Sequence, residues 1–413
     1  MGEQSHRGNS RSRFLSISGR PVSPPAVLLF LVTEDWYFLA HRLPMACAAQ
    51  REGYKVHVAT HVNAGAADIE KYGFVLHRLN WRRGSLNPIR VFSIIREVRA
   101  LYRKLAPDLI HHIALQAVVI GSLAATGLSP VRLNALSGLG FGFTSRTPKA
   151  LIIRPILAWL LRRVLKNRHA AVLVENPDDR AVLHALGVPK DCMFLIPGSG
   201  VDTATFAPLP EPQGPMTVAF VGRLLDDKGV RTLIAAHDIL AGRGAAPRLL
   251  IAGEPDPANP ASIPTDEIES WRRQPGVEML GHVSDIRALW SKAHIAVLPS
   301  RREGLPVSLL EAAACGRPIV ATDVPGCREV ARDGLNALVV SPDDPLALAD
   351  AMARLAQDGE LRRRFGAAGR RLVEENFSSA RIGREVVALY DSLLGRNVVA
   401  KEMAKSKPRG EGN

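Results

Sequence analysis

The stretch Pro299-Ser-Arg-Arg-Glu303-Gly-Leu-Pro-Val-Ser-Leu-Leu-Glu311 joins the apolar run 294–299 to a segment whose apolar residues have helical spacing. The run predicts a buried strand, and Pro306 stands where the first helical residue is expected. Glu303 should therefore end a strand, with Glu311 about a turn and a half into the next helix. Open α/β sheets bind ligands at that edge, where helix N–H groups can donate hydrogen bonds to a phosphate. Two carboxylates there suit a ligand with phosphate at one end and hydroxyls elsewhere.

A second junction of the same kind lies upstream. The β-rich run 216–221 is followed by Gly222-Arg223-Leu-Leu-Asp-Asp-Lys228-Gly229 and then by a helical pattern over 230–241. Gly222 allows the backbone to approach a ligand, Arg223 can donate two hydrogen bonds to phosphate, and Lys228 adds a charge near a helix start. The alternative for this junction alone is a charged loop on a sheet without a nucleotide, and for the first junction alone it is a solvated turn followed by a glutamate on a surface helix.

Together the two junctions, G-R-x₄-K-G followed by E-x₇-E, resemble the donor site of glycosyltransferase family 4, retaining enzymes that use nucleotide-sugars. The resemblance implies an α/β protein of the GT-B fold, with two Rossmann-like parallel-sheet domains facing an interdomain cleft. It assigns Arg223 and Lys228 to the diphosphate, Glu303 to the donor sugar and Glu311 to the ribose. The catalytic candidates are thus Arg223, Lys228 and Glu303, and the donor-binding candidates are Gly222, Val283, Gly304, Leu305 and Glu311.

The resemblance extends over residues 26–395. It includes the segments 196–202 with Phe206, 281–285, and 375–378 with Tyr390. A narrower similarity, carried by 83–88, 135–140 and Glu175-Asn176, is to bacterial N-acetylgalactosaminyltransferases that act on polyprenyl-diphosphate-linked sugars. It implies a lipid-linked acceptor.

Length and pattern predict two domains. At 413 residues the chain exceeds the usual size of one hydrophobic core. Strand-like runs at 26–32, 55–60, 74–77, 108–113, 131–136 and 170–174 alternate with helical patterns at 39–52, 88–105 and 150–166, which favours a parallel sheet. The expected division is a disordered basic tail (1–23), an acceptor domain (24–207), a Pro-rich linker (208–215), a donor domain (216–377), a closing helix (378–396) and a tail (397–413).

Candidates on the acceptor side follow the first strands. Trp36, His41 and Arg42 come after the first strand, and His111-His112 end the strand 108–113. Neighbouring strand residues point to opposite faces, so at most one of the two histidines should address the cleft. The family's histidine aligns instead with Ile113, which leaves that assignment open. Two glycines, Gly138 and Gly140, allow either a close approach to substrate or a flexible turn.

Charge is divided unequally between the halves. Residues 1–214 hold 26 Lys and Arg against 14 Asp and Glu, a net +12, whereas the remainder carries +1. A basic acceptor domain predicts an anionic partner. The segment 149–168 combines an apolar face, including Trp159, with a basic end, so it predicts either contact with anionic lipid or an ordinary sheet-covering helix. Since no apolar run reaches about 20 residues, we expect a cytoplasmic protein held peripherally at the inner face of the cell membrane.

The remaining features exclude other classes. Cys47, Cys192, Cys315 and Cys327 are too scattered for a metal site or disulfide scaffold, and Asp226-Asp227 is not a D-x-D metal motif. We therefore expect no cofactor and no metal, and no nucleic acid as partner because no nucleic-acid module is present. The prediction is a retaining transferase moving a sugar from a UDP-sugar to a carrier-linked glycan, in surface polysaccharide or glycoconjugate synthesis.

Three other activities were weighed. A sugar-nucleotide epimerase on a similar fold would explain the nucleotide site but not the basic first domain. A glycosidase would leave the Arg and Lys at the diphosphate unexplained. A Rossmann oxidoreductase is disfavoured because no G-x-G-x-x-G follows the first strand.

Overall fold

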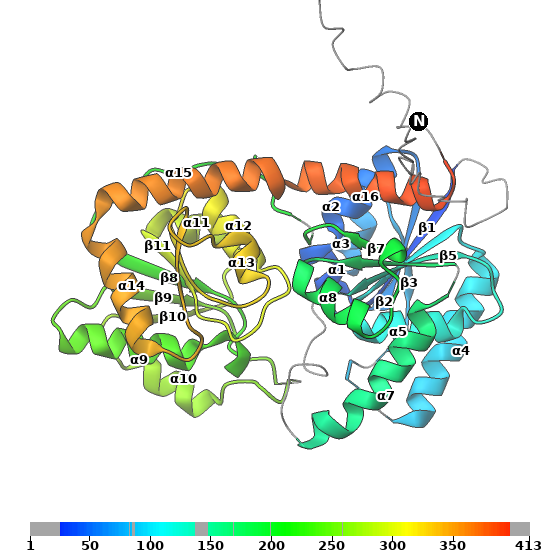
Figure 1. Ribbon diagram of the computed structural model, residues 1–413, viewed down its shortest axis with the longest axis horizontal. Coiled ribbons are helices and arrows are strands. Elements are labelled where there is room, and N and C mark those ends of the chain that lie inside the picture. The colour runs from blue at the N-terminus through cyan, green and yellow to red at the C-terminus, as the bar shows by residue number, and fades with distance from the viewer. Residues whose placement is uncertain are drawn as a thin grey trace, which may run out of the picture.

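The computed structural model shows two α/β domains side by side (Figure 1). It describes residues 25–81, 83–84, 87–136, 148–167, 169–198, 200–257 and 259–396. Gly138 and Gly140 lie outside the described residues, as do the two expected tails.

The first domain is built on a seven-stranded parallel sheet in the order β3-β2-β1-β4-β5-β6-β7. Its central strands are buried along their whole length, because helices cover both faces. The strands are β1 Val27–Glu34, β2 Lys55–His61, β3 Val75–Arg78, β4 Leu109–Ile113, β5 Val131–Leu136, β6 Ala170–Val174 and β7 Met193–Leu195.

Helices of this domain are α1 Asp35–His41, α2 Leu43–Arg51, α3 Ala66–Lys71, α4 Pro88–Leu105, α5 Ala114–Ala124, α7 Pro148–Leu165 and α8 Pro177–Ala185, with the 3₁₀ turn η1 Lys190–Cys192. The single helix predicted at 39–52 is wrong: two helices meet at Arg42, whose φ of −127° is not helical. Helix α5 was not predicted. Its sequence is apolar on all sides because the sheet covers one side and α4 and α7 contact others.

The second domain has a six-stranded parallel sheet in the order β10-β9-β8-β11-β12-β13. These strands are β8 Thr217–Val221, β9 Arg248–Ala252, β10 Val277–Gly281, β11 Ile295–Leu298, β12 Ile319–Thr322 and β13 Ala337–Val340. The helical elements are η2 Asp226–Lys228, α9 Val230–Gly242, α10 Thr265–Arg272, α11 Ile286–Lys292, α12 Val307–Ala314, α13 Cys327–Val330, α14 Pro345–Gln357 and α15 Gly359–Asn376.

The chain crosses twice between the domains, and the two crossings touch. Val201 N–H donates to Phe377 O, and Ser379 N–H donates to Val201 O, both at 2.9 Å. Gly200 has a φ of +69°, and a Cβ there would lie 2.5 Å from Phe377 O, so glycine is required. Helix α16 Ser379–Leu393 then packs on α2 of the first domain (Figure 1). This contact sets how the two sheets face each other.

Residues 208–215, expected as the linker, lie along the second domain. Leu209 N–H donates to Cys315 O at 3.1 Å, and the buried Arg317 guanidinium donates to Pro210 O at 2.7 Å. The chain therefore leaves the first domain near Gly200, several residues before this Pro-rich stretch.

Candidate active site

Two neighbouring strands of the second sheet carry the predicted donor motifs. β8 pairs with β9 on one side and with β11 on the other, so the loops after β8 and β11 adjoin at the carboxyl edge. Gly229 has a φ of +69°, and a Cβ on it would lie 1.9 Å from Pro299 O. Only glycine lets the two loops approach this closely.

The first pair in this site is Lys228 and Glu303. Lys228 Nζ lies 2.6 Å from Glu303 Oε1, and Ser300 Oγ donates to the same oxygen at 2.6 Å. The Glu303 side chain is only 8% exposed, whereas that of Lys228 is 21% exposed. The structure thus joins the two groups that the sequence assigned to opposite ends of one ligand.

Glu311 lies in the second turn of α12. This helix begins at Val307 with Pro306 as its N-cap, so the prediction of Pro306 as the first helical residue was wrong by one position. Burial raises the pKa of the Glu311 carboxyl to about 8. At neutral pH this group is largely protonated, and hydroxyls that donate to it would favour its ionised form.

Arg223 reaches the first domain through Asp256, in the loop after β9. Arg223 donates to Asp256 Oδ2 at 2.7 Å, and Arg83 of the first domain donates to the same oxygen at 3.2 Å. Both guanidinium groups also lie over the ring of Trp36, at 6.0 and 5.7 Å from its centroid. Sequence analysis missed Asp256, whose position after a parallel strand was the available signal.

The remaining donor candidates are backbone positions or packing residues. Gly222 lies against Gly253, where a Cβ would meet Gly222 O at 1.8 Å. The Gly304 carbonyl accepts a hydrogen bond from Asn176 Nδ2 of the first domain at 3.2 Å. Leu305 packs against Gly198, and Val283 is partly buried against the core of the second domain.

A pocket of about 490 Å³ lies between the domains beside Arg223. It is lined by residues that follow β1, β2 and β3 together with Asp256: Glu34, Trp36, His61, Asn63, Trp81, Arg83 and Asp256. Asn63 Nδ2 donates to Glu34 Oε2 at 2.9 Å. Amide and carboxylate groups of this kind bind sugar hydroxyls. Of the acceptor-side candidates, Trp36 lines this pocket.

His41 stands near the donor motifs. Its ring packs on Tyr37 at 4.4 Å between centroids. Burial lowers its pKa to about 3, and the positive charges of Arg42, Lys228 and Arg223 add to the effect. His41 is therefore neutral at physiological pH. It lies close enough to Arg223 and Lys228 for their positive charges to lower its pKa.

Comparison with known proteins now decides the family. Residues 27–167 match the model "Glycosyl transferase 4-like", and residues 215–358 match "Glycosyl transferases group 1". An alpha-maltose-1-phosphate synthase of Mycolicibacterium smegmatis is 30% identical over 291 residues, covering 65% of this chain and 72% of that protein. The chain belongs to the group 1 and group 4-like glycosyltransferases.

Other similarities agree with this assignment. The N,N'-diacetylbacillosaminyl-diphospho-undecaprenol alpha-1,3-N-acetylgalactosaminyltransferase of Campylobacter jejuni is 26% identical, over 78% of this chain and 87% of that one. Among solved structures, sucrose-phosphate synthase from Thermosynechococcus elongatus superposes with a TM-score of 0.75 at 22% identity, over 90% of this chain and 99% of that chain. HepE from Anabaena, in complex with UDP and glucose, gives 0.72 at 18% identity, over 89% and 99%.

The predicted family and GT-B fold are thereby confirmed, and the comparisons give no support to a sugar-nucleotide epimerase.

Three acceptor-side candidates of this glycosyltransferase do not line the cleft. His111 and His112 point to opposite faces of β4, as expected, but both are fully buried. His111 Nδ1 hydrogen-bonds Tyr390 Oη at 2.7 Å, and the His112 ring lies between Tyr102 Oη and Asn134 Oδ1 at 2.9 and 2.7 Å.

These contacts have a simple cause, because β4 is a central strand covered on both faces. The two histidines therefore join packed layers. Arg42 is likewise 1% exposed and donates to Glu175 Oε1 at 2.8 Å. It holds together α2 and the segment after β6.

The acidic residues of η2 form ion pairs with arginines. Asp226 pairs with Arg231 and Arg301, and Asp227 pairs with Arg302. Within the described part of the chain, no cluster of three or more His, Cys, Asp or Glu is arranged to hold a metal ion.

Proposed function

We propose that this glycosyltransferase moves a sugar from a UDP-sugar to a glycan carried on a polyprenyl diphosphate, with retention of configuration. The observation that carries the proposal is the Lys228–Glu303 pair at the carboxyl edge of one sheet, with Arg223 in the same loop as Lys228 and the half-buried Glu311 in the helix that follows Glu303. A UDP complex of HepE, a protein of the same fold, supports the donor class. The name of the Campylobacter jejuni relative supports the acceptor class and an N-acetylhexosamine donor.

The chemistry proceeds by exchange of ion-pair partners. In this structure Lys228 is neutralised by Glu303, and Arg223 by Asp256. A donor diphosphate would take over both cations, which then stabilise the negative charge that develops as UDP leaves. Glu303, released from Lys228, can accept hydrogen bonds from the hydroxyls of the donor sugar. Glu311 would accept hydrogen bonds from the ribose hydroxyls.

The site supplies this positive charge without a metal ion. Arg223 and Lys228 would provide two cations at the donor diphosphate. The carboxylates of Asp226 and Asp227 form ion pairs with arginines. We therefore propose a metal-independent transferase. A chelator should leave the rate of transfer within about twofold of the untreated enzyme; abolition by EDTA and recovery with Mn²⁺ or Mg²⁺ would contradict this.

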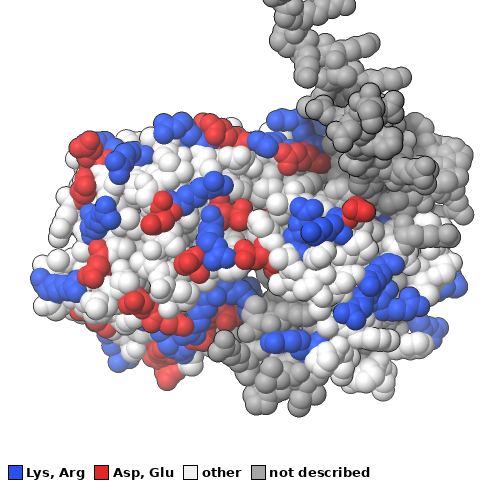
Figure 2. Space-filling model, viewed as in Figure 1, with Lys and Arg blue, Asp and Glu red and all other residues white. Residues whose placement is uncertain are grey.

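An anionic membrane surface is the proposed place of action. In the described part of the chain no helix has the length and apolarity needed to span a bilayer. Figure 2 shows Lys and Arg without neighbouring Asp or Glu over the lower part of the first domain, whereas the second domain mixes both signs. On α7, Ile156 and Trp159 are 63% and 66% exposed, while Leu161 and Leu165 are buried under the helix.

Helix α7 covers the sheet and also leaves an apolar surface exposed. Its inner face covers the sheet, and its outer face presents an apolar pair near the basic Arg163 and Lys166. The neighbouring Leu157 and Leu160 pack partly against the first domain. We propose that Ile156 and Trp159 enter the lipid interface, with the basic residues facing anionic headgroups.

The test of the proposed function is a donor and acceptor panel. The protein is incubated with UDP-, GDP- and ADP-sugars and a bacterial lipid-linked acceptor extract, and products are identified by mass. We expect UDP release coupled to one added hexosamine on the lipid fraction, with an α-linkage by NMR when the donor is α-linked. Transfer from ADP- or GDP-sugar alone, or an inverted linkage, would overturn the donor class or the stereochemistry.

A further inference from the structure

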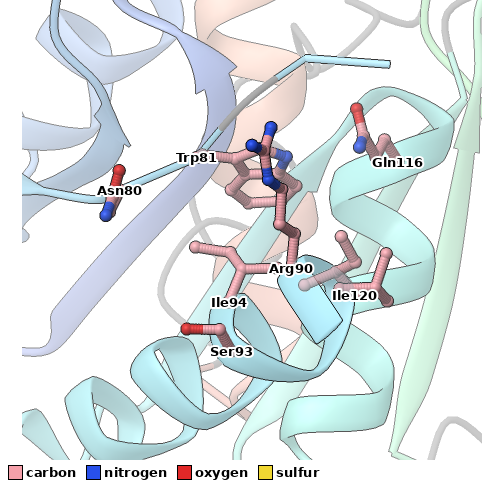
Figure 3. A pocket seen from close by; sticks show the side chains of 8 residues that line it. Asn80, Trp81, Arg90, Ser93, Ile94, Gln116 and Ile120 are labelled. Atoms are coloured by element: carbon pink, nitrogen blue, oxygen red, sulfur yellow. The ribbon is translucent and has the colours of Figure 1, made fainter. Parts of the chain in front are cut away.

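A polar cavity of the first domain takes no part in the donor site. It lies between α4 and α5, beside the segment that follows β3 (Figure 3), and encloses about 190 Å³. Its polar lining comprises a guanidinium, an indole N–H, a hydroxyl and two amides, from Arg90, Trp81, Ser93, Asn80 and Gln116. None of the described residues that line it has a carboxylate, and the nearby Glu97 carboxylate accepts from Asn80 N–H at 3.2 Å. A cavity with this set of donors suits an anion.

Trp81 gives independent evidence of a missing ligand. The side chain is 2% exposed, yet its Nε1–H is buried without a hydrogen-bond partner among the described residues. Buried indole N–H groups are normally satisfied, so this donor calls for an acceptor. Figure 3 shows Arg90 extending from α4 toward Trp81, with Gln116 facing them from α5. Arg90 itself has no ion-pair partner within the described part of the chain.

The start of α5 adds to the positive character of the cavity. Gln116 lies in the first turn of this helix, which has no side-chain N-cap. Ala114 begins the helix with a φ of +67°, a backbone conformation that is costly for a residue with a Cβ. Helix starts carry unpaired N–H groups and a partial positive charge, both of which favour an anion.

The location of this cavity indicates which part of a ligand it binds. Trp81 also lines the interdomain pocket that holds Glu34 and Asn63, so the two cavities share a wall. The α4 residues Ile89 and Phe92, neighbours of Arg90 in the chain, are 80% and 62% exposed. The cavity thus adjoins the hydroxyl-binding groups of the cleft through Trp81 and exposed apolar side chains of α4 through Arg90.

We infer that this cavity binds the diphosphate of the acceptor, with the acceptor sugar in the interdomain pocket and the prenyl chain over Ile89 and Phe92. The inference deepens the proposed function and rests on its lipid-linked acceptor. It assigns Arg90, Trp81 and Gln116 as the groups that recognise the carrier. The order of chemistries along the surface also sets the direction in which the acceptor lies.

Binding of farnesyl diphosphate to the UDP-saturated protein tests the inference without any turnover. UDP occupies the Arg223 and Lys228 site, so calorimetric titration then reports a second anion site. We expect farnesyl diphosphate to bind more tightly than inorganic pyrophosphate or farnesol. Arg90→Gln should weaken both phosphorylated probes at least about tenfold, the scale of one lost charge-assisted contact. Arg96→Gln, an exposed residue of the same helix, should change binding less than about twofold.

A second variant guards against a folding artefact. Trp81→Phe removes the unpartnered N–H while keeping most of the ring, and should weaken farnesyl diphosphate several-fold, with the melting temperature measured alongside. Unchanged binding in Arg90→Gln, or complete displacement of the probe by UDP, would overturn the inference.

A phospholipid headgroup is the other source of the same chemistry. Vesicles of phosphatidylglycerol form a separate arm of the experiment. Loss of vesicle binding in Arg90→Gln with intact farnesyl diphosphate binding would assign the cavity to a headgroup and reject the carrier. A different result would contradict the proposed function: the parent protein would transfer no sugar to a lipid-linked acceptor, although farnesyl diphosphate binds.

Discussion

The two domains differ in whether the candidate ligand-binding cations have carboxylate partners. At the carboxyl edge of the second sheet each predicted cation has a carboxylate partner, Lys228 with Glu303 and Arg223 with Asp256. On the first domain, Arg90 has no partner in the described residues, and apolar side chains such as Trp159 face solvent. The donor side is internally neutralised before any ligand arrives. Within the described part of the first domain, the charge of Arg90 and this apolar surface have no partner.

This difference indicates how each side binds. A donor must displace existing ion pairs, so it gains affinity only if its phosphates replace the carboxylates with good geometry. The proposed anionic, lipid-bearing acceptor would meet Arg90, which has no ion-pair partner among the described residues. Selectivity should therefore concentrate on the donor side, and long-range attraction on the acceptor side.

The largest expected effect is on the donor cations. Arg223→Ala or Lys228→Ala should lower turnover at saturating donor by at least about 10²-fold, because each removes a group that stabilises the leaving diphosphate. Arg243→Ala breaks a surface ion pair with Asp350 in the same domain and is the matched control, expected to stay within about twofold. Near-normal turnover in either site variant would refute the assignment.

The two glutamates should separate by affinity. Glu311→Gln should weaken free UDP about tenfold, since it removes the acceptor for the ribose hydroxyls. Glu303→Gln should not weaken UDP binding, because the diphosphate no longer has to displace a carboxylate from Lys228, and it should impair use of the donor sugar. Titration of UDP into both variants decides the matter; equal losses would show that the roles are misassigned.

The contrast between the domains also explains what could be predicted. Arg223, Lys228, Glu303 and Glu311 lie within two short strand-to-helix junctions, where local sequence sets position and the parallel sheet sets proximity. The alternation of apolar runs with helical patterns predicted parallel sheets, and the family resemblance implied the GT-B fold; the order of the strands was not predicted.

Acceptor-side residues depend on packing between distant segments. His111 meets Tyr390, which is 279 positions away in the chain, and Arg42 meets Glu175 at a separation of 133. No local pattern shows such contacts, so buried histidines were mistaken for cleft residues. Asp256 was missed for the same reason, because its partner Arg83 lies in the other domain.

Membrane contact should give a smaller effect, of several-fold in binding. Ile156→Ser with Trp159→Ser should reduce co-sedimentation with anionic vesicles and remove the part that resists salt. Leu335→Ser with Leu346→Ser, at exposed apolar positions of the second domain, is the control and should sediment like the parent. Electrostatic attraction should fall as the Debye length shortens from about 10 Å at 0.1 M salt to about 3 Å at 1 M. Binding indifferent to lipid charge and salt would favour a soluble acceptor.

The smallest expected effect is a pH-dependent change in stability at Glu311. Its folded pKa of about 8 lies above the ordinary value of 4.5, so the unfolded chain loses this proton at lower pH than the native protein does. The stability of the unliganded parent should therefore fall between about pH 4.5 and pH 8 and then level off. Glu311→Gln lacks this titration. Its melting temperature should exceed that of the parent by a margin that grows over the same window, on the order of a few °C. Glu360→Gln, which removes an exposed carboxylate from α15, is the control. If the melting temperatures of Glu311→Gln and the parent change in parallel from pH 4 to pH 9, burial does not raise the pKa of this carboxyl. Ribose binding would then not require the deprotonation of a buried carboxyl group.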